Sequence, residues 1–214
     1  MGDTGAAARG RLSARPGAGA AERARDAWLL EVPAAAQAGR ACPLVVLFHG
    51  AGASARAGLE LFPSDVDVIR LAPQSSGSTW DVIEGGFGPD VQRLDDALST
   101  VFASYPIDED RVALAGFSDG ASYALSLGIG NGDLVTHIIA FSLGFLAPQE
   151  QRGRPRIFAT HGTQDRVLPI DRCSRRVIPR LRSAGYDITY EEFNGGHIVT
   201  PEQSRRAAEW LLHV

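Results

Sequence analysis

The sequence predicts one α/β domain in which helices cover both faces of a mostly parallel sheet. Short runs of β-forming residues alternate with segments of helical period along the 214 residues, as in chains built from βαβ units. The run Pro43–His49 is almost entirely apolar, which is expected of a central strand that is buried on both faces. The segment 91–105 repeats its apolar residues at helical spacing, which indicates a helix packed on such a sheet.

The remaining elements follow in chain order. Residues 1–20 are rich in Gly, Ala and Arg, so we expect a flexible segment ahead of a domain formed by residues 21–214. Residues 34–41 and 73–89 are expected to form loops. Thr200 and Pro201 suit the N-cap and the first turn of a last helix. We expect strands at 26–32, 43–49, 66–72, 112–115, 137–141, 156–160 and 188–193, and helices at 55–61, 91–105, 121–127, 171–184 and 201–212.

Composition excludes several classes of function. The net charge of −4 gives no reason to expect nucleic acid or an anionic membrane as a partner. No apolar run approaches the length that spans a bilayer, so no stable membrane insertion is expected. All 21 basic residues are arginines, which excludes chemistry on a lysine side chain.

The two cysteines and residues 1–20 indicate the cellular compartment in which we expect the protein. Cys42 and Cys173 do not lie at metal-ligand spacing, so we expect no zinc site. Residues 1–20 lack the uninterrupted apolar run of a secretory signal. We therefore expect a cytoplasmic protein with two free thiols, while a disulfide between them stays open at this point.

The clearest motif is Gly116-Phe-Ser118-Asp-Gly120, which joins an apolar strand to a helix-permissive segment. A Ser in this setting is the nucleophile-elbow pattern. The turn is so tight that a Cβ two residues before or after the Ser would clash, and glycine removes both clashes. Ser118 would then stand at a helix N-terminus, where N–H groups stabilise an oxyanion. The alternative is an ordinary Gly-rich turn.

A weaker copy of this motif follows at Ala140-Phe-Ser142-Leu-Gly144. Alanine replaces the first glycine, and little helical pattern comes after it. We interpret Ser142 as the end of a strand that lines the site.

Other strand ends supply the partners that a nucleophilic Ser needs, because functional groups gather at the C-terminal ends of parallel strands. Asp165 follows one strand in a short polar turn, and we prefer it to Asp171 as the fixed carboxylate. His197 follows the last strand in a glycine loop, which suits a general base. The first central strand leads to His49-Gly-Ala51-Gly, where His49 braces the loop. The N–H groups of Ala51 and Asp119 are our candidates for an oxyanion hole.

Together these pieces resemble the α/β-hydrolase superfamily, and within it the phospholipase/carboxylesterase group with its acyl-protein thioesterases. The order Ser118, Asp165, His197 is the order of that superfamily. The resemblance covers residues 26–214. It rests on Val45-Val-Leu-Phe-His-Gly50, Thr79-Trp-Asp81, Ile107-Asp-Glu-Asp-Arg111, Gly116-Phe-Ser-Asp-Gly120, His161-Gly with Asp165 and Val167-Leu-Pro169, and Gly196-His197.

The resemblance implies an α/β-hydrolase fold and a serine carboxylesterase that needs no metal or organic cofactor. Only a short segment separates the strand ending near Phe141 from the next strand, so we expect no cap domain and an open site for short- to medium-chain esters or thioesters. Activity should rise with pH through an apparent pKa near ~7. A non-catalytic ligand-binding scaffold, a peptidase or a polyester-oligomer hydrolase remain alternatives, and a homodimer stays open. The candidate apolar walls of the substrate site are Trp80, Phe87, Phe145 and Leu146.

Overall fold

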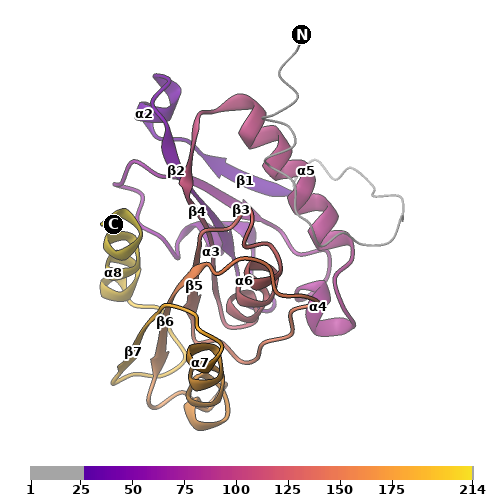
Figure 1. Ribbon diagram of the computed structural model, residues 1–214, viewed down its shortest axis with the longest axis vertical. Helices are drawn as coiled ribbons and strands as arrows, with labels where there is room; N and C mark the ends of the chain where they lie inside the picture. Colours follow the sequence, from indigo (N-terminus) through magenta and orange to yellow (C-terminus); the bar gives the residue numbers. More distant parts are fainter. Residues whose placement is uncertain (1–26, 214) are drawn as a thin grey trace.

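The computed structural model describes residues 27–213, which form one seven-stranded sheet in the order β1-β3-β2-β4-β5-β6-β7 (Figure 1). Only β1 runs antiparallel to its neighbour. The expected flexible segment 1–20 lies outside the described residues, and the boundary at residue 21 stays a prediction. The strands are β1 Trp28–Glu31, β2 Cys42–Phe48, β3 Ile69–Pro73, β4 Ile107–Phe117, β5 His137–Phe141, β6 Arg156–Gly162 and β7 Ile188–Phe193.

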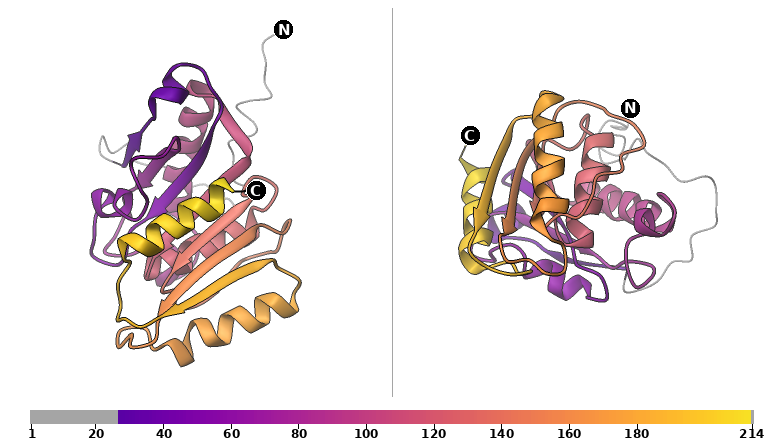
Figure 2. Two further views of the ribbon diagram at one scale, coloured as in Figure 1. Left: turned by 90° about the vertical axis from the view of Figure 1, so that its left-hand side faces the viewer. Right: turned by 90° about the horizontal axis from the view of Figure 1, so that it is seen from below.

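Helices cover the two faces of this sheet, as Figure 2 shows in its right-hand view. Helices α5 (Pro89–Ser104), α6 (Asp119–Gly130) and α7 (Ser174–Ser183) pack on one face. Helices α3 (Ala55–Leu59) and α8 (Pro201–Leu212) pack on the other. The fold class predicted from the sequence is therefore confirmed.

Strand β2 shows why a fully apolar run belongs at the centre. Leu44, Val46 and Phe48 point into the apolar core beneath α5 and α6, whereas Val45 and Leu47 point into the core beneath α3 and α8. Side chains alternate between the faces of a strand, so a strand with two covered faces needs apolar residues at every position.

The structure corrects several element boundaries. The expected loop 34–41 contains the short helix α2 (Ala34–Gln37), and the expected loop 73–89 contains α4 (Asp81–Glu84). Strand β4 begins five residues early, because Ile107 already pairs with Cys42 ahead of an irregularity in the register. The expected helix 171–184 is split at Cys173 into a 3-10 turn, η1 (Ile170–Arg172), and α7, since the backbone of Cys173 leaves the helical region.

The segment 142–155 between β5 and β6 contains no helix or strand, so no cap domain is inserted there. At the C-terminus, Thr200 is the N-cap of α8 and Pro201 lies in its first turn, as the sequence predicts, and Gln203 completes a capping box with Thr200. Cys42 and Cys173 are both buried and not paired. Within residues 27–213, no helix is both long and apolar enough for a membrane span.

Candidate active site

The turn from β4 to α6 has the geometry of a nucleophile elbow. Ser118 is the single residue between strand and helix and adopts the left-handed angle φ 58°. A Cβ on Gly116 would lie 2.2 Å from the carbonyl oxygen of Gly120, and a Cβ on Gly120 would lie 2.2 Å from that of Phe48. Contacts this short are not tolerated, so both positions require glycine. The tight packing around the turn therefore holds Ser118 at this unusual backbone angle.

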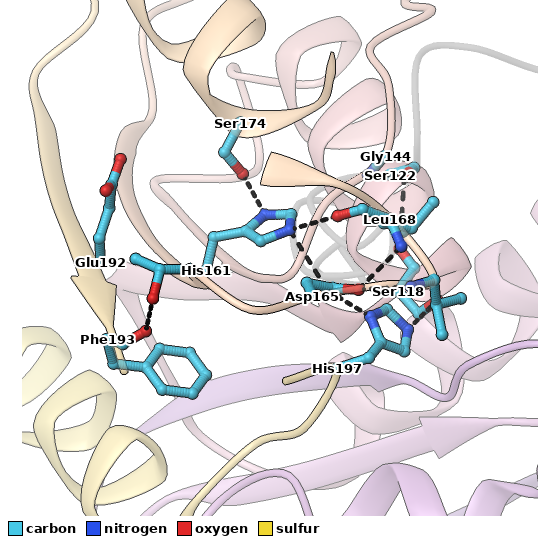
Figure 3. A network of polar contacts seen from close by, with 12 residues as sticks. Ser118, Ser122, Gly144, His161, Asp165, Leu168, Ser174, Glu192, Phe193 and His197 are labelled. Carbon is cyan, nitrogen blue, oxygen red and sulfur yellow. Dashed lines mark hydrogen bonds and ion pairs between the residues drawn. The ribbon is translucent and has the colours of Figure 1, made fainter. Parts of the chain in front are cut away.

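Three side chains from three strand ends meet at this turn (Figure 3). The Nε2 atom of His197 lies 2.9 Å from the Oγ of Ser118, and its Nδ1 lies 2.6 Å from Oδ2 of Asp165. Because the carboxylate only accepts, Nδ1 carries the proton and Nε2 can accept from the Ser118 hydroxyl. The structure thus brings together the three residues that the sequence predicted.

The carboxylate of Asp165 is held on both oxygens. Its Oδ1 accepts from the N–H groups of Val167 and Leu168 at 2.9 and 2.8 Å, and Oδ2 accepts from His197. Burial alone would raise the pKa of Asp165, but these hydrogen bonds outweigh it and place that pKa below its ordinary value. The alternative acid, Asp171, is exposed and pairs with Arg175 at 2.8 Å.

A second histidine lies against the same carboxylate. His161 is fully buried at the end of β6, and its Nε2 is 3.3 Å from Oδ2 of Asp165. Sequence reasoning gave His161 no role. The sequence signal that could have indicated a role for His161 is its position directly before the turn that carries Asp165.

The candidate oxyanion hole lies between β2 and α6. A Cβ on Gly50 would be 3.6 Å from the Cβ of Ser118, so the loop holding Ala51 begins beside Ser118. Asp119 is the first residue of α6, so no carbonyl of that helix accepts its N–H. Its carboxylate accepts from the Thr79 hydroxyl at 2.7 Å.

His49 braces this loop, as expected from the sequence. Its Nδ1 lies 2.7 Å from the carbonyl oxygen of Gly50, and its Nε2 accepts from the N–H of Ser75 at 3.3 Å. Burial lowers the pKa of His49, so the ring is neutral with its proton on Nδ1.

A cavity of about 580 Å³ opens beside Ser118 and His197. Its walls are mainly apolar, and Glu60 is the acidic residue among those that line it. Among residues 27–213 the exposed large hydrophobic side chains are Val167, which lines this cavity, and Ile198, which follows His197. The other lining residues are His49, Gly50, Ala51, Ala53, Ala57, Leu61, Phe117 and Val199.

None of the four predicted substrate residues lines this cavity. Trp80 is 1% exposed, stacks on Tyr123 and donates from Nε1 to the carbonyl oxygen of His49 at 2.8 Å. It supports the loop that begins at His49, because the segment 73–89 folds inward onto α6 rather than across the cavity. Phe87 also faces Tyr123, and Leu146 packs against the core. Whether Phe87, Phe145 and Leu146 contact a substrate stays a prediction.

Ser142 does not line the site either. Its side chain is fully buried and is absent from the cavity walls. Within the described part of the chain, no group of three or more His, Cys, Asp or Glu side chains could hold a metal ion.

Comparison with known proteins agrees with this geometry. The phospholipase/carboxylesterase family model matches residues 82–213. Esterase PE8 superposes with a TM-score of 0.69 at 25% identity, over 88% of this chain and 98% of its own. A phospholipase/carboxylesterase from Dyadobacter fermentans gives 0.67 at 21% identity, over 87% and 96%. The carboxylesterase of Bacillus cereus gives 0.66 at 19% identity, over 86% and 92%. No curated protein sequence matches the chain.

The family match spans more than half of the chain, and the sheet order, the elbow and the absence of a cap agree with it. The chain therefore belongs to the phospholipase/carboxylesterase family of α/β-hydrolases and is an ester-cleaving hydrolase.

Proposed function

We propose that the protein is a serine carboxylesterase in which Ser118 is the nucleophile, His197 the general base and Asp165 the residue that orients the base. The observation that carries this proposal is the unbroken path of two hydrogen bonds, 2.9 and 2.6 Å long, from Oγ through the imidazole to the carboxylate. A hydroxyl is a weak nucleophile at neutral pH, and an adjacent oriented base is what activates it.

In the proposed reaction, Ser118 Oγ attacks the ester carbonyl carbon while its proton moves to Nε2 of His197. The N–H groups of Ala51 and Asp119 donate to the oxyanion, and each such donor is worth about 10²–10³ in rate. The tetrahedral intermediate expels the alcohol or thiol, which takes the proton from His197. Water then attacks the acyl-enzyme, His197 accepts its proton, and release of the acid regenerates Ser118.

The cavity supports a preference for short- to medium-chain, uncharged acyl groups. It measures about 580 Å³, its walls include Leu61, Phe117 and Val199, and among the described residues no cap domain is inserted between β5 and β6. The carboxylate of Glu60 would repel an anionic group placed in the same cavity. A longer substrate would meet the adjoining cavity, which shares Glu60 and Val199 but is lined by the ion pairs of Arg56, Arg70 and Arg205. Thioesters fit the same chemistry.

The test is active-site labelling with a fluorophosphonate, which reacts only with an activated serine. We expect one adduct on wild type, located by mass spectrometry at Ser118, and none on the Ser118→Ala variant. Hydrolysis of p-nitrophenyl butyrate should fall about 10⁴-fold or more in that variant, because loss of the nucleophile removes the covalent path. Among the acetate, butyrate, octanoate and palmitate esters, palmitate should be the poorest substrate.

Ser142→Ala is the matched control, since Ser142 is a second left-handed serine at the same sheet edge. It should label and hydrolyse like wild type. An adduct on Ser142, or no adduct on a folded wild-type protein, would contradict the proposal. The second result would put a non-catalytic scaffold ahead of the esterase.

A further inference from the structure

Asp165 lies between two imidazole rings rather than facing one. Its Oδ2 accepts from Nδ1 of His197 at 2.6 Å, and Nε2 of His161 lies 3.3 Å from the same oxygen (Figure 3). The side chains of His161 and Asp165 are fully buried, whereas His197 reaches the surface of the site. The reaction proposed above assigns no task to His161.

The partners of His161 fix which nitrogen carries its proton. Nε2 lies 2.8 Å from the carbonyl oxygen of Leu168, which can only accept, so Nε2 carries a hydrogen. Burial lowers the pKa of His161, and the ring is therefore neutral. Its bare Nδ1 then accepts from the hydroxyl of Ser174 at 2.5 Å. Ser174 is itself fully buried, at the first turn of α7.

These hydrogen bonds connect the ring of His161 to the turn that holds the carboxylate of Asp165. Leu168 accepts from His161 through its carbonyl oxygen and donates to Oδ1 of Asp165 through its N–H at 2.8 Å. Oδ1 is thus fixed by backbone, and Oδ2 is bordered on one side by His161 and on the other by His197. Rotation of the carboxylate away from His197 would break contacts on both oxygens.

Burial outweighs the surrounding charges in keeping the ring neutral: Asp165 and Glu192 raise the pKa of His161, whereas His197 lowers it. The charged or titratable groups that act on it are Asp165, Glu192 of β7 and His197. A protonated His161 would place a second positive charge on Asp165 and compete with the His197 imidazolium that forms during the reaction. A neutral N–H supports the carboxylate without that competition.

We propose that His161 is a positioning residue: its neutral ring, with its tautomer set by the carbonyl of Leu168 and its Nδ1 held by Ser174, keeps Asp165 in line with His197. This inference rests on the proposed function, because it assigns His161 a role in the same reaction. Ser174 contributes through the ring and not through substrate.

The test compares two variants of His161 whose side-chain amides replace different nitrogens of the imidazole ring. In His161→Gln the amide nitrogen falls near the former Nε2 and can still donate to Leu168. In His161→Asn the shorter side chain places its amide near the former Nδ1, and the contact with Asp165 is lost. We expect the fluorophosphonate labelling rate to fall about ten- to a hundredfold in the Asn variant and to stay within about threefold of wild type in the Gln variant, as small displacements at a reacting group have large effects.

A direct readout separates positioning from general destabilisation. The proton shared by Asp165 and His197 should give a low-field NMR resonance in wild type and in His161→Gln, and the resonance should be lost or displaced in His161→Asn. For p-nitrophenyl butyrate the Asn variant should lose kcat while KM stays near the wild-type value. His137→Asn, the same change at a buried histidine at the start of the neighbouring strand β5, away from the strand ends that carry the site, is the matched control and should leave the labelling rate unchanged.

Each result of these experiments either supports or overturns the proposal. Equal labelling rates and equal low-field resonances in the Asn, Gln and wild-type proteins would overturn it. If the Asn variant does not fold, Ser174→Ala decides: a labelling rate reduced about two- to fivefold supports a ring held in place by Ser174, and an unchanged rate overturns the proposal. If wild type is not labelled at all, the proposed function fails, while the resonance still shows whether His161 positions Asp165.

Discussion

Ser118 and Ser142 occupy equivalent positions on neighbouring strands. Strands β4 and β5 pair in parallel with Phe117 opposite Phe141, so each serine directly follows a matched residue. Both serines adopt left-handed angles, φ 58° and 53°, and each has a glycine two residues later. The N–H of each serine donates to the next strand across, Ser118 to Phe141 at 3.0 Å and Ser142 to Thr160 at 2.8 Å.

The two serines differ in what lies opposite the hydroxyl. After Ser118 the chain enters α6 at once, and Oγ faces His197. After Ser142 no helix follows. Instead the N–H groups of Gly144 and Phe145 donate to the hydroxyl of Ser122 on α6, which draws the segment over Ser142. Among the described residues the Oγ of Ser142 has no hydrogen-bond partner and is buried. A left-handed serine at a strand end is therefore not enough for the proposed reaction, which also requires a base beside the hydroxyl and access to substrate.

The glycines around the two turns give the largest expected contrast. Gly116→Ala places a Cβ 2.2 Å from the backbone oxygen of Gly120, so we expect a loss of about 3 kcal/mol or more in unfolding free energy, or no folded protein. Gly144→Ala places a Cβ 3.3 Å from a methyl of Leu168, which can move, and should lose about 1 kcal/mol or less. Urea unfolding of both variants measures the difference. Equal losses would mean that the elbow is not specially tight.

The residues around Ser118 were predictable because their signals are local. Gly116 and Gly120 flank the nucleophile within five residues, and Asp165 and His197 each follow a readable strand in a short polar turn. The C-terminal ends of parallel strands converge on one edge, so knowing the strands was enough to bring these side chains together.

The walls of the cavity were not predictable in this way, because they depend on packing between distant segments. Trp80 lies in a Gly/Ser-rich loop, and from the sequence we expected it to face the substrate. Its indole N–H instead donates to the carbonyl oxygen of His49. The actual walls include Ala57 of the short helix α3 and Val199 near the C-terminus. The role that we propose for His161 depends in the same way on its contacts with Leu168 and Ser174, which no local sequence pattern indicates.

Strand β5, which ends directly before Ser142, also carries a pH-sensitive group at its start. Burial, and then the charges of Arg156 and Arg111, lower the pKa of His137 from 6.5 to about 4. Between these values the unfolded chain binds a proton that the folded chain does not, so the unfolding free energy falls as pH falls from about 6.5 to about 4. The full effect is about 3 kcal/mol.

His137→Gln should flatten this dependence in urea unfolding measured across that range. A slope remains, since burial also lowers the pKa of His49 and of His161. His213→Gln, at an exposed histidine beyond α8, is the control and should keep the wild-type slope. If the His137→Gln curve parallels wild type, the buried ring of His137 is not the source of the acid sensitivity.

The smallest expected effect concerns the cavity beside Ser118. Ser142 does not line this cavity. Glu60 places a carboxylate on that cavity, so a p-nitrophenyl ester of succinate should react more slowly than the butyrate ester, which is similar in length but uncharged. Because Glu60 is exposed and its field is screened, Glu60→Gln should raise the succinate-to-butyrate ratio of kcat/KM only about two- to fivefold, and less at high salt. Glu209→Gln on α8 makes the same charge change away from this cavity and should leave the ratio unchanged. A ratio that responds equally to both substitutions would mean that only net charge matters and that the acyl group does not enter beside Glu60.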